Sequence, residues 1–422
     1  MIKLDLPLYR PNHVDIEITD ICDISCAHCG NDSNPENDMI LSKDLIQEVM
    51  RGAKNADITT FSVGGGEPFF VFDELCNLVK VGVENGIIPS YIGTNAFFAT
   101  TPDDAKLYLS ELKRSGFSEI SKIDMTKLKS SRWSSPVEQD AYIKSGGLNI
   151  SFDMFHQEFV DVSNVANLIK AYDDVFGSTD NIQIKSSYAS GYELEYSMFI
   201  FLMAELYVRG IDVTDCYDLK RYSGIEGLID AFFNEEKIRL KCGDIDFYPS
   251  PVWSVGRAEF LDTDLLNLDE YDFIQWPNDY CSLGNECATN IQVKPDGSVY
   301  ANPEFVCESL GLYLGNVNDT SFEDIIESTQ DNMILDILSL GGPHALRYFM
   351  ENAGIDVDIK SEEPCHFCFQ ALSDENVLDA LNNYYNSSDR VELYNSYLRE
   401  HPQRVIVSDI NESVSYDFFK II

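Results

Sequence analysis

The stretch HVDIEITDICDISCAHC, residues 13–29, decides the fold of this 422-residue chain. Its first part alternates apolar and polar residues, so residues 14–18 are predicted to form a strand. The strand leads into Cys22, Cys26 and Cys29, three thiols within eight residues. Three thiolates at this spacing can bind three irons of a cubane cluster and leave the fourth iron open for a ligand. A zinc site is the alternative, although zinc favours four protein ligands or a histidine partner.

The rest of the chain repeats this strand-and-loop pattern as far as about residue 260. Strands are expected at 14–18, 58–63, 89–93, 148–152, 181–185 and 244–248, and helices at 43–54, 72–86, 101–115, 157–174, 192–209 and 223–238. This alternation predicts parallel strands joined by helical crossovers. The expected fold class is therefore α/β, a partial, TIM-like (β/α)6 barrel over residues 1–260. A cysteine-rich extension of a hairpin and helices is expected over 261–375, and a helical tail over 376–422.

Charge limits the kinds of partner. Lys and Arg total 30 against 71 Asp and Glu, a formal net charge of −41. Such a surface repels phosphate backbones and attracts basic peptides or proteins, so no nucleic-acid partner is expected. Solubility or a salt-tolerant host is the other explanation of the charge. Residues 106–144 form a locally basic island, which is either a solvated insertion or a contact for substrate.

Nothing in the sequence predicts export or a membrane partner. The first residues lack the apolar core of a signal peptide, and the longest apolar stretch, 198–206, is interrupted by Glu205. A cytoplasmic location is expected. The eleven cysteines then point to metal or iron–sulfur ligation rather than to disulfides. Three isolated cysteines are expected to be buried small apolar residues: Cys76, Cys216 and Cys242.

A second motif, Gly64-Gly65-Gly66-Glu67-Pro68, ends the second expected strand. Glycines allow the backbone to approach a ligand closely. Their carbonyl groups and the Glu67 carboxylate are acceptors only, which suits an ammonium group. A tight turn with an exposed glutamate is the alternative. Because this motif follows the three cysteines by one strand–helix unit, the ligand-binding interpretation is the stronger.

In these two motifs the sequence resembles the radical S-adenosylmethionine (SAM) superfamily, which carries Cys-x3-Cys-x2-Cys after strand one and Gly-Gly-Glu-Pro after strand two. Thr94-Asn95-Ala96 resembles the family's Thr-Asn-Gly, with Ala96 departing from it. Residues 150–153, Ile-Ser-Phe-Asp, resemble its strand-four motif, and Pro251 with 256–258, Gly-Arg-Ala, resembles the segment after strand six. His28 stands where relatives place an aromatic residue beside the adenine.

The resemblance implies a reduced 4Fe–4S cluster that cleaves SAM to a 5′-deoxyadenosyl radical, which abstracts a substrate hydrogen. Glu67 would hold the methionine ammonium, while Ser151 and Lys185 would reach the carboxylate or the ribose. Lys185 rests on position alone, and a solvated lysine is its alternative. The SAM contacts implied as a set are His28, Gly65, Gly66, Glu67, Pro68, Asn95, Ser151, Asp153, Lys185 and Arg257. An electron donor such as flavodoxin or ferredoxin is implied as a partner.

The remaining cysteines resemble a SPASM domain or its shorter form, twitch, which bind auxiliary clusters. The resemblance rests on Cys281-x5-Cys287, the hairpin expected at 290–302, the Leu-Gly-Asn at 314–316 and Cys365-x2-Cys368. Five cysteines cannot fully ligate two cubanes. One auxiliary 4Fe–4S cluster is therefore predicted, bound by Cys287, Cys307, Cys365 and Cys368, with Cys281 as the alternate ligand. A structural zinc ion is the alternative.

The family and its extension suggest a peptide substrate. The enzyme would post-translationally modify a ribosomally made precursor by cross-linking, epimerisation, cleavage or oxidation. A separate leader-binding protein is a further candidate partner. The alternatives are a radical SAM dehydrogenase of a small molecule, a protein oxidase resembling sulfatase maturases, and a non-catalytic cluster protein. Asp153 and Tyr188 lie at expected strand ends, but neither can be singled out as a catalytic acid or base.

Overall fold

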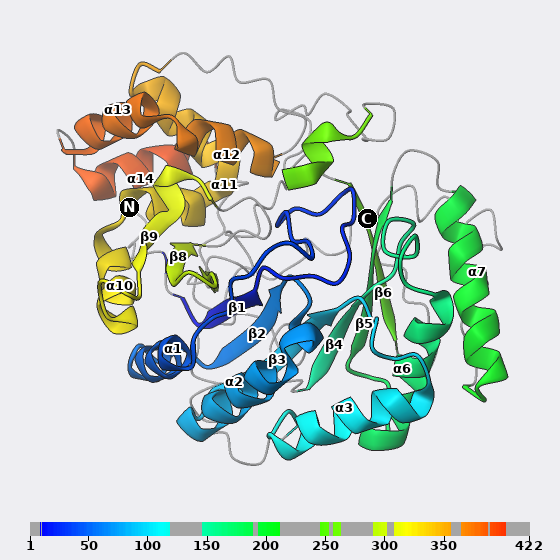
Figure 1. Ribbon diagram of the computed structural model, residues 1–422. Coiled ribbons are helices and arrows are strands. Elements are labelled where there is room, and N and C mark those ends of the chain that lie inside the picture. Colours follow the sequence, from blue (N-terminus) through cyan, green and yellow to red (C-terminus); the bar gives the residue numbers. More distant parts are fainter. Residues whose placement is uncertain are drawn as a thin grey trace, which may run out of the picture.

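The computed structural model describes residue 9 and residues 11–118, 146–188, 193–211, 245–252, 256–262, 290–301, 308–355, 364–386 and 389–401. Its strands form one nine-stranded sheet in the order β6-β5-β4-β3-β2-β1-β7-β8-β9 (Figure 1). The strands are β1 (His13–Thr19), β2 (Thr60–Gly65), β3 (Ile88–Thr94), β4 (Gly147–Ser151), β5 (Ile182–Tyr188), β6 (Asp246–Pro251), β7 (Asn290–Val293), β8 (Ser298–Ala301) and β9 (Tyr313–Asn316). Strands β1 to β6 are parallel throughout, which confirms the predicted α/β class.

Helices follow the parallel strands in the expected alternation. Figure 1 shows α1, α2 and α3 along one side of the sheet. The α-helices of this part are α1 (Lys43–Asn55), α2 (Phe72–Asn85), α3 (Pro102–Arg114), α6 (Val162–Phe176) and α7 (Glu193–Val208). Two 3-10 helices belong to the strand ends, η1 (Pro68–Val71) after β2 and η3 (Gly256–Phe260) after β6. The helix expected at 223–238 lies outside the described residues, as does most of the basic island.

Ser, Thr and Asp side chains define where these helices begin. Ser42, Thr101 and Asp161 each accept a hydrogen bond from a backbone N–H of the first turn of α1, α3 and α6. Helix α6 begins at Val162 rather than at residue 157 as expected, because residues just before Asp161 are used by turns that Asp153 organises. The outer face of the sheet is apolar, and the helices bury it.

The C-terminal extension is continuous with the barrel sheet. Strand β7 pairs in parallel with β1, with His13 opposite Asn290 and Ile16 opposite Val293. Strands β8 and β9 then continue the sheet in antiparallel pairs, which confirms the expected hairpin. The helices of the extension are α10 (Phe322–Ser328), α11 (Met333–Asn352), α12 (Pro364–Ser373), α13 (Glu375–Asn386) and α14 (Arg390–Glu400), with η4 (Leu310–Leu312) and η5 (Thr329–Asp331) between strands and helices.

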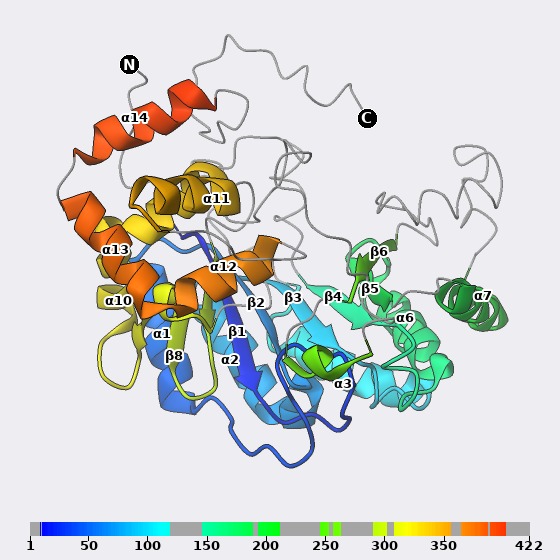
Figure 2. The same cartoon turned by 90° about the horizontal axis from the view of Figure 1, so that it is seen from above.

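The extension also packs on the barrel through its first helix. Gly52 of α1 lets Phe322 of α10 approach closely, because a Cβ at Gly52 would lie 2.9 Å from the Cβ of Phe322. Asn55 donates a 2.7 Å hydrogen bond to Glu323 beside this contact. Helices α11, α12 and α13 pack on one another, and both views show them together at the end of the molecule that holds β8 and β9 (Figure 2). No described helix is long and apolar enough to cross a membrane. The division into domains ending at residues 260 and 375 remains a proposal.

Candidate active site

The three cysteines of the opening motif lie on one loop between β1 and α1. The loop is pinned at both ends by its own backbone: Cys22 N–H donates to the Asn34 carbonyl (3.2 Å), and Leu41 N–H donates to the Ile18 carbonyl (2.8 Å). Cys26 is buried, whereas Cys22 and Cys29 are half-buried. The loop therefore has a fixed path that leaves Cys22 and Cys29 more exposed than Cys26.

Arg257, on η3 after the edge strand β6, clamps this loop. Its guanidinium donates to the carbonyls of Cys26 (2.9 Å) and Ser33 (2.7 Å) and pairs with Asp32 (2.9 Å). Its backbone N–H donates to the carbonyl of Cys29. Gly256 has a φ of +56°, and a Cβ there would overlap the Gly30 carbonyl. Arg257 thus contacts the cysteine loop, and its predicted contact with SAM stays a prediction.

Two glycines of the second motif, Gly65 and Gly66, pack closely against the start of the same loop. Gly66 N–H donates to the Thr19 carbonyl (2.7 Å) and Glu67 N–H to the Ile21 carbonyl (2.8 Å). A Cβ on Gly65 would overlap the Thr19 carbonyl, and one on Gly66 would overlap the Ile21 carbonyl. Only Gly64 of the three faces open space, with nothing within 4 Å of the position of a Cβ. Gly65 and Gly66 therefore allow close approach to protein backbone, not only to a ligand as the sequence suggested.

Glu67 is buried, and its carboxylate joins the ends of β2 and β3. It accepts hydrogen bonds from Phe69 N–H (3.0 Å), the Thr94 hydroxyl (2.9 Å) and Asn95 N–H (2.7 Å). Burial raises the pKa of Glu67 to about 8, against the lowering effect of these hydrogen bonds. The alternative of an exposed turn glutamate is wrong, because Glu67 is only 1% exposed. Its contact with the methionine ammonium stays a prediction.

Asn95 connects this carboxylate to the cysteine loop. Its side-chain amide donates to Asp23 Oδ1 (2.8 Å) and lies 3.9 Å from the sulfur of Cys22. The next residue, Ala96, is fully buried with a φ of +66°, the left-handed region that favours glycine. The departure of Ala96 from the family's glycine therefore retains the backbone conformation that a glycine would adopt without strain.

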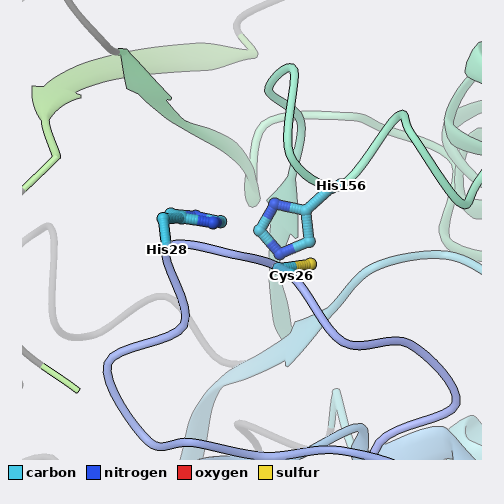
Figure 3. Close-up of side chains that lie close together, drawn as sticks. All are labelled: Cys26, His28 and His156. Atoms are coloured by element: carbon cyan, nitrogen blue, oxygen red, sulfur yellow. The ribbon is translucent and has the colours of Figure 1, made fainter. Parts of the chain in front are cut away.

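A third group lies after β4 (Figure 3). His156 Nδ1 donates to both oxygens of the buried Asp153 carboxylate, at 2.8 and 2.9 Å, and its other ring nitrogen faces Cys26. His28 stacks on Phe155, with ring centroids 4.4 Å apart, and its Nε2 lies 3.6 Å from Asp153 Oδ2. Hence one face of His28 is covered by protein, and a stack on adenine would have to use the other.

The charges of this group are interdependent. Burial alone would raise the pKa of Asp153, but the charge and hydrogen bonds of His156 lower it to about 2. Burial lowers the pKa of His28 to about 4. For His156 the burial effect is outweighed by Asp153 and by a hydrogen bond with Cys26, which raise its pKa. Asp153 is therefore ionised and holds His156 in place beside Cys26.

Apolar side chains surround the cysteines. Cys26 packs in a buried cluster that the half-buried Cys22 and Cys29 border, and this cluster consists of Ile24, Cys26, Phe155, Val160, Val252 and Ala258. Burial raises the pKa of the Cys22 thiol, and the nearby Glu67 and Asp23 raise it further. A thiolate there consequently needs the positive charge of a bound metal centre. An iron–sulfur cluster fits this site for three reasons. The loop offers three thiols, apolar side chains shield them, and a thiolate at Cys22 needs a nearby positive charge.

Polar residues that the sequence reading missed line the face of β1 opposite to the helices. His13 Nδ1 lies 2.6 Å from the hydroxyl of Thr60, and its Nε2 lies 3.0 Å from that of Ser62. Nearer the strand end, the buried Glu17 contacts Gln292 and lies 3.9 Å from Lys294. The signal was present as polar residues at every second position of 13–19, although both faces of parallel strands are usually apolar.

The structure describes only some of the remaining predicted site residues. Ser151 and Lys185 lie side by side on β4 and β5, and Lys185 is exposed. Pro68 is buried at the start of η1. Cys365 and Cys368 lie one turn apart on α12, and Cys368 is buried. The other predicted auxiliary ligands lie outside the described residues: Cys281, Cys287 and Cys307. The auxiliary cluster therefore stays a prediction.

The family comparison agrees with this geometry. Residues 16–121, which hold the cysteine loop, the glycine motif and Asn95, match the model of the Radical SAM superfamily. The match to a radical SAM domain covers these residues of the chain. A comparison with curated proteins finds no match. The superfamily implies a 4Fe–4S cluster and SAM as the cofactors of this domain, and the described cysteine loop fits the cluster.

Solved structures similar to the chain include complexes of proteins with S-adenosylmethionine (AdoMet). SuiB from Streptococcus suis, bound to S-adenosylmethionine, is 17% identical over 78% of this chain and 68% of its own, with a TM-score of 0.43. The anSMEcpe protein with bound AdoMet is 15% identical over 92% and 99%, with a TM-score of 0.46. BtrN in complex with AdoMet and 2-DOIA is 12% identical over 86% and 98%, with a TM-score of 0.41. The resemblance to the radical SAM superfamily therefore rests on the family match and the motifs, not on these sequence identities and TM-scores.

Proposed function

We propose that the chain is a radical SAM enzyme that modifies a ribosomally made peptide. One observation carries the first half of this proposal: Glu67, Asn95 and Asp23 form a continuous hydrogen-bonded link from the glycine motif to the cysteine loop. Two motifs that the sequence separates by 38 residues, from Cys29 to Glu67, are thereby held in one arrangement at the carboxyl ends of the strands, where parallel barrels place their active sites.

Cys22, Cys26 and Cys29 would hold the cluster, and the open position of Gly64 would admit the methionine end of SAM. When bound, this pair of cofactors supplies a 5′-deoxyadenosyl radical that abstracts a substrate hydrogen. The residues of the chain position and shield it. Arg257 and Gly66 fix the path of the loop, and Phe155 and Val252 exclude water from the sulfur of Cys26.

Charge and the ligands of similar proteins support a peptide substrate. A net charge of −41 favours a substrate with a basic segment. The relative SuiB has been crystallised with the precursor peptide SuiA, and anSMEcpe with the peptide Cp18Cys. An auxiliary cluster in the extension, which joins the barrel sheet where β7 pairs with β1, would supply a second iron–sulfur centre as an electron acceptor. Cross-linking, epimerisation, cleavage and oxidation of the peptide all remain within this proposal.

The test uses the full chain reconstituted with iron and sulfide without oxygen. With SAM and dithionite it is expected to release 5′-deoxyadenosine, and Cys26→Ala is expected to abolish release. Cys76→Ala, which removes a half-buried thiol far along the chain from the loop, is the control and should retain it. Release at the wild-type rate by Cys26→Ala contradicts the cluster assignment. Stimulation by a basic precursor peptide with a mass change supports the peptide substrate, whereas stimulation by a small alcohol alone contradicts it.

A further inference from the structure

Cys26, one of the three cysteines of the loop, also lies close to two histidines, His28 and His156. Each offers one ligand atom, and these atoms all lie within 4.8 Å of one another (Figure 3). One thiolate and two imidazoles form a donor set that suits Zn²⁺ and other borderline divalent ions. His28 comes from the cysteine loop and His156 from the turn after β4, so the fold rather than the sequence spacing brings them together.

His156 is oriented as a metal-bound histidine is. Its Nδ1 donates to Asp153 at 2.8 Å, which leaves Nε2 directed toward Cys26. Metal-ligating histidines commonly donate their second nitrogen to a carboxylate in this way, which fixes the tautomer and the ring orientation. Asp153 is itself held by the N–H groups of Phe155 (3.0 Å) and Ser187 (3.3 Å). The supporting shell of a metal ligand is thus already built.

His28 supplies an independent observation. Its Nδ1 is buried and has no hydrogen-bond partner among the described residues. A buried polar atom without a partner is costly, and a bound ion would satisfy it. The stack on Phe155, at an interplanar angle of 21°, fixes the plane of the ring. The lone pair of His28 Nδ1 is therefore available to bind a metal ion when Nε2 carries the proton.

We propose that the chain, when it holds no cluster, binds one Zn²⁺ at Cys26, His28 and His156, with the fourth position left to water. Binding releases the thiol proton of Cys26 to solvent. Because the zinc site and the cluster both require Cys26, the ion excludes the cluster and the cluster excludes the ion. The chain would then have two exclusive metal states, and zinc would delay its maturation.

The test compares zinc binding and cluster assembly in matched variants of the full chain, freed of metal and kept without oxygen. Zn²⁺ is titrated against a chromophoric chelator, and Co²⁺ reports thiolate ligation by its charge-transfer band. Since the second set of cysteines can also take zinc, Cys26→Ala defines the loss of one equivalent. His28→Phe and His156→Phe are each expected to weaken that equivalent at least tenfold, because the loss of an outer-shell partner of a ligand alone costs about 10- to 100-fold. The double variant Cys22→Ala/Cys29→Ala is expected to retain it.

Cluster assembly should show the reverse pattern. The double cysteine variant is expected to lose the cluster, while both histidine variants take up iron and sulfide. Preloading with Zn²⁺ should slow assembly in the wild-type chain and not in His156→Phe. Far-UV circular dichroism checks that each variant is folded, and His156→Gln replaces His156→Phe if that variant is not. Wild-type zinc binding by folded histidine variants, or its loss in the double cysteine variant, overturns the proposal without bearing on SAM cleavage.

Discussion

The backbone N–H of Asn95 donates a 2.7 Å hydrogen bond to the buried carboxylate of Glu67, and this bond ties the end of β3 to the end of β2. Asn95 in turn reaches Asp23 on the cysteine loop. The residue best known from its motif as a ligand-binding acid is therefore also a structural bridge. A change at Glu67 should affect the shape of the site as well as the binding of SAM.

The buried Glu67 should make stability depend on pH. Its pKa of about 8 in the folded chain lies above its ordinary value of 4.5, so the folded state binds more protons between these values. The free energy of unfolding should consequently fall as the pH rises from about 5 to 8, by at most roughly 1.4 kcal/mol per pH unit. Thermal melts of the cluster-free chain measure this. Glu67→Gln should lose most of this slope, and an unchanged slope in the variant would show that other groups cause it.

Gly66 and Gly64 should respond differently to an added methyl group. Gly66→Ala would overlap the Ile21 carbonyl, whereas Gly64→Ala has open space. We expect Gly66→Ala to lower the free energy of unfolding by about 3 kcal/mol and to reduce iron content after reconstitution, because overpacking forces the loop to move. Gly64→Ala should retain stability and iron content while it weakens SAM binding, measured by equilibrium dialysis. Equal iron loss in both variants would contradict the packing explanation.

Replacement of Ala96 by glycine should not destabilise the protein, whereas replacement of the nearby Ala99 should. Ala96 has a φ of +66°, where a Cβ costs roughly 1 kcal/mol or more. Ala96→Gly is therefore expected to leave stability unchanged or to raise it by up to about 1 kcal/mol, after the entropy of glycine is subtracted. Ala99→Gly, at a buried residue that has no positive φ, should lower stability by about 1 kcal/mol. Chemical denaturation of both variants gives the comparison, and equal destabilisation would refute the prediction.

Arg257 should be needed for the cysteine loop to retain its cluster. Its guanidinium makes three contacts with the loop, and lysine cannot reproduce that fork. Arg257→Lys is expected to speed the loss of iron to a chelator several-fold and to lower stability by about 2 kcal/mol. Arg399→Lys, on an exposed ion pair with Glu392, is the control and should change neither quantity. Wild-type iron retention in Arg257→Lys would mean that the clamp is dispensable.

Much of the barrel follows from the sequence because its information is local. The alternation around residues 14–18 and the cysteine spacing were enough to predict β1 and the loop, and β1 to β6 all lie within a few residues of expectation. The partners of Arg257 and His156 were not predictable in the same way. They contact Cys26 from more than 100 residues away, and only the order of strands in the sheet brings them there. Asp153 was noticed as a strand-end residue, but its hydrogen bonds to His156 depend on a turn that resembled a helix.

The pairing of β7 with β1 has a consequence for how the chain is made. Residue 13 leaves the ribosome long before residue 290, its partner in the sheet. At 5 to 20 residues per second, the edge of β1 stays open for roughly 15 to 55 seconds of synthesis. An open strand edge is a template for wrong pairing with other chains. Charged side chains such as those of Asp15 and Glu17 on β1 are the kind that discourages such pairing. Slowed translation between the two strands would lengthen the period of risk.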